Sequence, residues 1–389
     1  MKKLLFAFSL PLLVLTISAQ SIYDFKIIKE NPITEVKNQS STGTCWSFSG
    51  VGLLESELLR MGKGSFDLSE MYIVRRNYEE KAVKYARMHG NLNFAAGGSF
   101  ADVIETINDF GIMPDEVYQG LNYGSETHNH GELDKILKGY MDGIIGARSL
   151  SPVWLEGFSA ILDTYLGELP ESFNYDGKQY TPHSFAKYLG LNQDDYISLT
   201  SFSHHPFYEP FAIEVPDNWR WADSYNLPVD GLMEVMENAI MQGYTIAWAT
   251  DVSEAGFSRE GVAIVPDENA DENAGSDQAR WLGLSSRERD ADLRMRVGTD
   301  LLAEKTITQE MRQRSFNDYS TTDDHGMQIY GIAEDQNGNR FYMVKNSWGK
   351  TGPYKGLWYA SDPFVRYKTL TIVVHRDAIP SSIAGKLGL

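Results

Sequence analysis

The sequence predicts an α+β protein in which a helical half precedes a β-sheet half. Apolar residues recur at three- and four-residue spacing at Val51, Leu54 and Leu58, which is the stripe of a helix that buries one face. Toward the other end of the chain, residues 327–333 and 340–345 have the pattern of strands. Helices that come first and strands that come later are typical of the α+β class.

The stretch between these two regions supplies further elements. Apolar periodicity predicts helices at residues 134–140, 154–166 and 182–189. A run of β-branched and aromatic residues predicts another strand at 244–249. The middle of the chain is therefore expected to be mostly helical before the sheet begins.

Cys45 is the only cysteine, and it stands in the run Gly43-Thr44-Cys45-Trp46-Ser47. A single cysteine cannot form an internal disulfide, so its thiol is a buried side chain, an intermolecular link or a nucleophile. Gly43 permits a tight turn just before the sulfur, and the apolar stripe follows it, so Cys45 should open a helix. Backbone N–H groups at a helix N-terminus favour the thiolate, which makes the nucleophile the preferred interpretation.

A cysteine nucleophile needs a base, and His325 is the best placed of the eight histidines. It follows a polar turn and opens a strand pattern, so its imidazole should lie at the start of a strand. A second strand pattern ends in Asn346-Ser347-Trp348. If the two strands are adjacent, the Asn346 amide can hold the far nitrogen of the His325 ring, and Trp348 can keep water from that hydrogen bond.

In this order and spacing the residues resemble the papain-like cysteine peptidases, and within them the bleomycin hydrolase and aminopeptidase C branch. The resemblance implies that Cys45 is the nucleophile, His325 its base and Asn346 the group that orients the base. It also implies a papain-like fold with the active-site cleft between the helical half and the sheet half. The other positions that it assigns are the oxyanion-hole side chain Gln39, the substrate-binding residues Gly97, Gly98 and Asp324, and the supporting residues Trp46 and Trp348.

The family core is shorter than this chain of 389 residues, so the resemblance also implies an inserted segment. We expect one papain-like peptidase domain at residues 20–389. Its parts are a helical half at about 40–115, a helix-rich insertion at about 120–215 and a sheet half at about 216–380.

The first residues have the layout of a secretory signal peptide. Lysines at positions 2 and 3 precede an apolar run from Leu4 to Ile17, and Ala19 offers a small residue for cleavage. Residues 1–19 are therefore predicted to direct export to the periplasm or the medium. The run is too short to span a bilayer comfortably, so no membrane anchor is expected.

The charge of the chain bears on its partners. The net charge is −18 at pH 7. A surface this acidic repels the phosphates of nucleic acids, so nucleic acid is excluded as a partner and peptides are the expected substrates.

Two histidine pairs are candidate metal ligands. His204 and His205 are adjacent, so their side chains are expected to point to different sides, and no cysteine or third histidine lies near them. His128 and His130 are interpreted as part of a solvated loop. No metal site and no cofactor is predicted.

These observations predict an exported cysteine peptidase that works through an acyl-enzyme, as an aminopeptidase on oligopeptides. In the resembled branch, a C-terminal arm blocks the cleft beyond the substrate's first residue, and the resemblance implies a hexamer. Here the tail at residues 379–389 is short for that task, which leaves open an endopeptidase or dipeptidyl-type peptidase with an open cleft. A catalytically silent scaffold that binds peptides is the alternative from another class.

Overall fold

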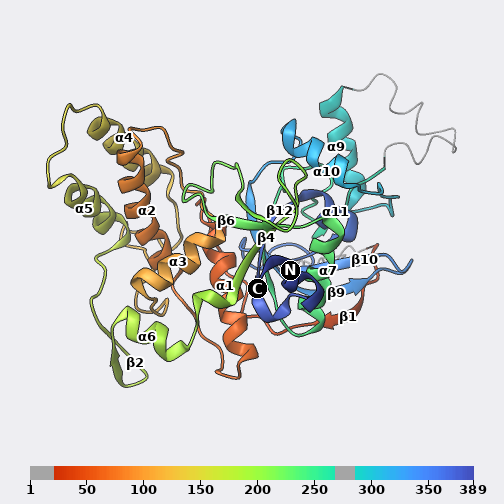
Figure 1. The fold of residues 1–389 in the computed structure, drawn as a ribbon, viewed down its shortest axis with the longest axis horizontal. Helices are drawn as coiled ribbons and strands as arrows, with labels where there is room; N and C mark the ends of the chain where they lie inside the picture. Colours follow the sequence, from red (N-terminus) through yellow and green to blue (C-terminus); the bar gives the residue numbers. More distant parts are fainter. Residues whose placement is uncertain (1–21, 268–284) are drawn as a thin grey trace, which may run out of the picture.

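The computed structural model describes residues 22–267 and 285–389, so the predicted leader at residues 1–19 lies outside the described chain. Helices α2 to α6 lie on one side and a large sheet lies on the other, with helix α1 between them (Figure 1). The mixed α+β fold predicted from the sequence is confirmed. None of the described helices is long and apolar enough to cross a bilayer.

The helical side is built around one apolar cluster that the predicted insertion shares. Leu133 and Leu137 of α4 and Phe158 of α5 are buried in the same cluster as Tyr72 and Tyr78 of α2. The insertion therefore enlarges the helical half and has no separate core. The elements on this side are α1 (Cys45–Arg60), α2 (Glu70–Arg87), α3 (Phe100–Phe110), α4 (Gly131–Ile145), α5 (Trp154–Leu166), the hairpin β2 (Phe173–Tyr175) and β3 (Lys178–Tyr180), and α6 (Pro182–Leu189).

The other side is a sheet of ten strands. In spatial order its strands are β5 (Pro210–Ala212), β6 (Asp223–Asn226), β4 (Tyr196–Thr200), β12 (Thr369–His375), β7 (Ile246–Thr250), β9 (His325–Glu334), β10 (Arg340–Lys345), β11 (Leu357–Ser361) and β8 (Val262–Ala263), and β1 (Lys26–Glu30) also pairs with β9. The helices of this side are α7 (Val229–Met241), α9 (Ser286–Val297), α10 (Gln309–Asn317), α11 (Asp362–Lys368) and α12 (Ser381–Leu387). Short 3₁₀ turns lie at Gln193–Asp195 and Arg376–Ala378.

The sheet takes in strands that the sequence analysis placed in the insertion. Strand β4 pairs with β12 in the register Thr200↔Thr371, and β5 extends the same sheet through β6. The segment expected as a helix-rich insertion is therefore mostly helical before Tyr196 and contributes strands to the sheet after it. The physical reason is that a five-residue strand gains its hydrogen bonds from β12, which lies far away in sequence.

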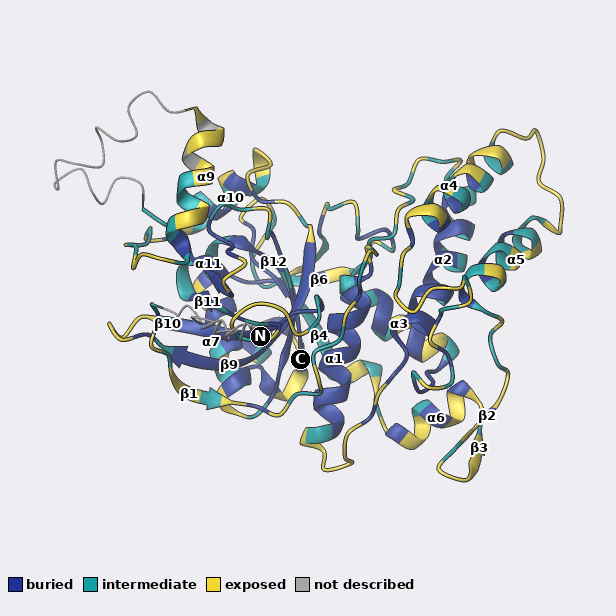
Figure 2. Cartoon of the chain, turned by 180° about the vertical axis from the view of Figure 1, so that it is seen from behind, coloured by how far each residue is buried: buried dark blue, intermediate teal, exposed yellow. Residues whose placement is uncertain are grey.

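Helix α1 is the element that joins the two sides. All its residues from Trp46 to Leu58 are buried, because helices cover one face of it and the sheet covers the other (Figure 2). The side-chain amide of Gln328 on β9 donates to the carbonyl of Gly52 on α1 at 2.9 Å. Glycine at position 52 permits this approach, because a Cβ there would lie 3.0 Å from Oε1 of Gln328.

A short backbone pairing ties the insertion to the loop before Cys45. The Ser41 N–H donates to the His128 carbonyl, and the His130 N–H donates to the Ser41 carbonyl, both at 3.1 Å. His130 is fully buried beside Tyr78, so the interpretation of this histidine as part of a solvated loop is wrong. The buried His130 N–H thereby finds its partner in the Ser41 carbonyl.

Candidate active site

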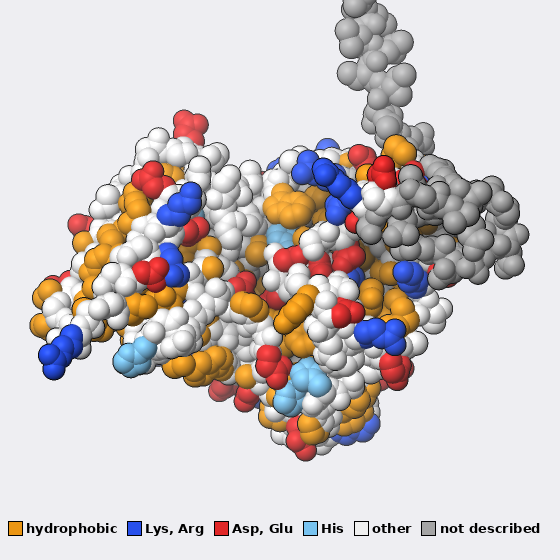
Figure 3. All heavy atoms as spheres, turned by 90° about the horizontal axis from the view of Figure 1, so that it is seen from above, with side chains coloured by type: hydrophobic (Ala, Val, Ile, Leu, Met, Phe, Trp, Pro, Cys, Tyr) orange, Lys and Arg blue, Asp and Glu red, His pale blue; other side chains and the backbone are white. Residues whose placement is uncertain are grey.

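Cys45 is the first residue of α1, as the sequence predicts. Its thiol is free and half-buried, and it lines a pocket together with Gly98 and His325. This pocket lies where the molecular surface is hollowed between the helical side and the sheet side (Figure 3). The beginning of α1 therefore presents the sulfur to the space between the two halves of the fold.

Gly326 brings β9 close to the first turn of α1. A Cβ at this position would lie 2.8 Å from Oγ of Ser49 and 3.3 Å from Cα of Trp46. Because glycine lacks that atom, the strand can pack directly on the helix. Its neighbour His325, the first residue of β9, consequently shares the pocket with Cys45.

His325 and Asn346 meet because β9 and β10 are antiparallel neighbours, with Lys345 opposite Gln328. The His325 Nε2 atom lies 2.8 Å from Oδ1 of Asn346, and the backbone N–H of Ser347 donates to the same oxygen at 2.7 Å. Since this oxygen accepts from Ser347, Nε2 of His325 must carry the proton that it shares with Asn346. In the neutral imidazole the other ring nitrogen, Nδ1, is then unprotonated.

The two tryptophans predicted to support the site pack against different parts of it. The Trp348 ring stacks on the His325 ring with centroids 4.7 Å apart. The Trp46 Nε1–H donates to the Ala96 carbonyl at 3.1 Å, and a Cβ on Gly98 would lie 2.8 Å from the Trp46 ring. Trp348 thus covers the imidazole, while Trp46 fixes the loop that carries Gly98.

Gln39 is buried and held at both ends of its amide. Its Nε2 donates to the Thr42 carbonyl at 2.7 Å, and its Oε1 accepts from the Ser347 hydroxyl at 2.6 Å. This side chain does not itself line the pocket around Cys45. One hydrogen of Nε2 has no partner among these bonds, which leaves a donor on a rigid amide.

Gly97 departs from the expectation that both glycines lie open to a substrate backbone. A Cβ on Gly97 would overlap the carboxylate of Asp217, so the chain's own side chain fills the space over this residue. Of these two glycines, only Gly98 lines the pocket. The expected extra strand of substrate along Gly97 is therefore obstructed by Asp217.

Three carboxyl groups line the pocket: Asp217, Asp323 and Asp324. Asp324, which was predicted to bind substrate, already accepts the Val252 N–H at 2.9 Å, and burial raises its pKa to about 6. Burial, with smaller contributions from the charges of Asp217 and Asp324, raises the pKa of Asp323 to about 8. Asp217 and Asp323 are pocket residues that were not expected from the sequence. Asp323 precedes Asp324 directly, whereas no local pattern marks Asp217.

The pocket opposes charge on the two central groups. Burial raises the pKa of the Cys45 thiol to about 12, backbone N–H groups of Gly326 and Trp46 lower it, and the carboxylates of Asp323 and Asp217 raise it further. Burial lowers the pKa of His325 to about 4, and the hydrogen bond that its ring donates to Asn346 opposes that shift. Both shifts favour a neutral thiol and imidazole. The backbone N–H groups near the start of α1 thus act in the direction expected from the sequence, but burial outweighs them.

We expect Asp323→Asn to speed alkylation of Cys45 by iodoacetamide above about pH 8, and to leave it unchanged at pH 6. The Asp323 carboxyl has a pKa of about 8, so it is protonated below that pH and charged above it. Its charge raises the pKa of the thiol, and the variant should therefore react about 3- to 10-fold faster at pH 9. Mass spectrometry of the labelled protein gives the rates.

The matched control for this measurement is Asp109→Asn, which changes an exposed carboxylate at the end of α3. It should follow the wild-type rates at every pH. A rate ratio for Asp323→Asn that stays constant from pH 6 to pH 9 would show that this carboxyl does not act on the sulfur.

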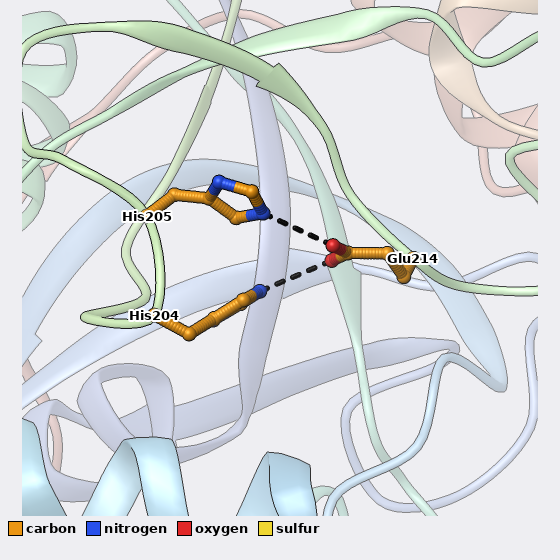
Figure 4. A group of neighbouring side chains, drawn as sticks. All are labelled: His204, His205 and Glu214. Carbon is orange, nitrogen blue, oxygen red and sulfur yellow. Dashed lines mark hydrogen bonds and ion pairs between the residues drawn. The ribbon is translucent and has the colours of Figure 1, made fainter.

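His204, His205 and Glu214 form a cluster near the pocket (Figure 4). Both ring Nε2 atoms face the carboxylate, at 3.1 Å and 3.0 Å, so the expectation that the rings point to different sides is wrong. The His205 ring stacks on Phe211 and the His204 ring on Phe316, and this packing turns the rings toward Glu214.

The three donor atoms of the cluster lie within 4.8 Å of one another, a set that suits zinc. However, each Nε2 is already hydrogen-bonded, and the Glu214 side chain is 58% exposed. Glu214 alternates with Ile213 and Val215, which line the pocket. The cluster therefore supports the pocket wall formed by Ile213 and Val215 from the side opposite the pocket.

The end of the chain does not reach this pocket. Ile383 and Leu387 of α12 are buried in the apolar cluster of the sheet side, together with Leu232 and Val235 of α7. No residue after Thr371 lines the pocket around Cys45. The described tail therefore leaves the cleft unblocked.

Comparison with known proteins gives two family matches. The profile of the papain family cysteine proteases matches residues 20–135, and that of the peptidase C1-like family matches residues 299–388. The first match includes Cys45, and the second includes His325 and Asn346.

Named relatives match most of the chain. Aminopeptidase C of Streptococcus thermophilus is 23% identical over 88% of this chain and 80% of its own length. Aminopeptidase G of Lactobacillus delbrueckii subsp. lactis is 23% identical over 89% of this chain and 82% of its own. The crystal structure of PepW from Lactobacillus rhamnosis HN001 superposes with a TM-score of 0.70 at 19% identity, and it covers 93% of this chain and 84% of that one. The likeness to PepW shows a shared fold.

Proposed function

Since this chain belongs to the papain-like cysteine peptidases, in the aminopeptidase C branch, we propose that it hydrolyses peptides through Cys45, His325 and Asn346. The observation that carries the proposal is the 2.8 Å hydrogen bond between His325 and Asn346 at the edge of the pocket that Cys45 opens into. A nucleophile, a base and a group that orients the base are the parts that covalent catalysis by cysteine requires.

In the first step His325 holds the thiol proton and the Cys45 sulfur attacks the peptide carbonyl carbon. The Cys45 backbone N–H and the spare Nε2 hydrogen of Gln39 stabilise the oxyanion, a contribution of about 2–4 kcal/mol at such sites. The C–N bond then breaks, and His325 gives its proton to the departing amine. In the second step water, with His325 as base, hydrolyses the thioester and restores the thiol.

The pocket favours substrates with a free amino group. Asp217, Asp323 and Asp324 line it, and no lysine or arginine does so in the described part of the chain. Charged carboxylates in the pocket, of which Asp323 becomes one only above about pH 8, attract the ammonium group of a peptide N-terminus and repel carboxylates. We therefore propose aminopeptidase action on oligopeptides, outside the cytoplasm if residues 1–19 act as the predicted leader.

One observation favours the open-cleft alternative. Helix α12 packs against α7 and not in the pocket, so the described tail provides no block against longer peptides. A chain with an unblocked cleft is expected to cut internal bonds.

A peptide library digested with and without N-terminal acetylation separates these functions. We expect the unblocked peptides to lose residues one at a time from the N-terminus, and the acetylated peptides to resist, because acetylation removes the ammonium group. Mass spectrometry of the products gives the cleavage sites, and Cys45→Ser is the control for contaminating peptidases. Equal internal cleavage of both libraries would assign an endopeptidase, and no cleavage of either would assign a silent peptide-binding scaffold.

A further inference from the structure

Asp217 lies on a loop that the fold holds rigidly beside the pocket. The buried Asn218 side chain donates to the carbonyls of Ile213 and Ala222 at 3.1 Å and 3.0 Å, and it accepts the Ala222 N–H at 2.9 Å. These three bonds close the loop on itself. Asp217 is therefore positioned before any substrate arrives.

The residues after Asn218 attach the same loop to α3. The Trp219 Nε1–H donates to Asp102 at 3.0 Å, and the Arg220 Nε–H donates to the same carboxylate at 2.6 Å. Asp102 is buried in the first turn of α3, where it also accepts the Ser99 N–H at 2.7 Å. Loop and helix thus share one anchoring carboxylate, which fixes Asp217 relative to Gly98.

The Asp217 carboxylate is short of cationic partners. Within the described residues it accepts one hydrogen bond, from Nδ2 of Asn93 at 3.3 Å, and it makes no ion pair. The nearby ammonium of Lys81 is bound to the carbonyls of Ala95 and Gly97. Burial of the Asp217 side chain raises its pKa, and the charge of Lys81 lowers it. A cation that enters the pocket would therefore stabilise the charged form of this half-buried carboxylate through a charge-assisted hydrogen bond.

The same carboxylate also limits the length of the pocket. It fills the space over Gly97, where a peptide running beyond the residue held at Gly98 would have to pass. The tail in α12 lies elsewhere, so Asp217 is the group that obstructs this path. Charge and obstruction therefore come from one side chain.

We propose that Asp217 binds the free α-ammonium group of a peptide substrate and stops the substrate chain beyond its first residue. The inference rests on the proposed function, since it concerns the peptide that Cys45 attacks. It assigns aminopeptidase specificity in this chain to the loop at residues 213–222, in place of the tail. The ligand class is a peptide with an unblocked N-terminus.

Two variants separate charge from obstruction. Asp217→Asn keeps the size of the side chain and removes its charge, whereas Asp217→Gly removes both. The substrates are an aminoacyl coumarin amide with a free amino group and its N-acetylated form. We expect Asp217→Asn to lower kcat/KM on the free substrate about 10- to 100-fold, mainly through KM, and to leave the acetylated substrate uncut. Asp217→Gly should show the same loss and should also cut the acetylated substrate.

Asp223→Asn is the matched control, because it changes an exposed carboxylate that follows the same loop and does not line the pocket. It should keep wild-type kinetics. Wild-type kcat/KM on the free substrate in Asp217→Asn would overturn the inference, and so would an Asp217→Gly enzyme that folds and still rejects the acetylated substrate. An inactive wild-type enzyme would instead contradict the proposed function, and thermal unfolding identifies a variant that failed to fold.

Discussion

Cys45→Ser is expected to lower kcat/KM for peptide substrates by about 1,000-fold or more while the protein stays folded. The serine hydroxyl is far less acidic than a thiol and a weaker nucleophile in this pocket. The loss should appear in kcat, because the groups that bind the peptide remain in place. Release of coumarin from an aminoacyl amide gives the rates, and thermal unfolding reports on the fold.

The substitution is conservative for the fold because Cys45 makes no disulfide and is only half-buried. The melting temperature of Cys45→Ser should therefore stay within a few degrees of the wild-type value, because substitutions outside the core usually change stability only slightly. If the variant kept more than about a tenth of wild-type activity, the cysteine mechanism would be wrong.

A graded loss is expected at the base and its orienting group. His325→Ala should cost nearly as much as Cys45→Ser, because no group then takes the thiol proton or protonates the departing amine. Asn346→Ala should cost about 10- to 100-fold, because the imidazole remains but can rotate away from the sulfur. Steady-state kinetics on the free aminoacyl substrate measures both losses.

His183→Ala is the control for these variants, because this histidine is exposed at the start of α6. His375 is the other histidine to test. Its ring stacks on Tyr244 with centroids 5.0 Å apart and lies outside the pocket, so His375→Ala should keep most of the activity. Equal and small losses for His325→Ala and Asn346→Ala would contradict the assigned roles.

The sequence was most informative where a local pattern coincided with a chemical requirement. The stripe after Cys45 predicts α1, which begins at that residue. The patterns at His325 and before Asn346 predict two strands, and these are β9 and β10. Antiparallel pairing of the two strands then places the histidine beside the asparagine, as their order in the chain suggested.

The remaining features depend on contacts that no local pattern reveals. Asp217 reaches Gly97 only because the loop at residues 213–222 is anchored to Asp102, which lies more than a hundred residues earlier in the chain. His204 and His205 converge on Glu214 because each ring stacks on a different phenylalanine. In both cases tertiary packing decides where a polar side chain points, and periodicity carries no signal for it.

The pairing of Ser41 with residues 128–130 bears on how such proteins can be recombined. A chimera that joined α3 directly to β4 would strip the partners from the Ser41 N–H and carbonyl, only four residues before Cys45. A replacement for this segment would therefore have to present a backbone carbonyl and a backbone N–H opposite Ser41, so that the loop before the nucleophile keeps its support.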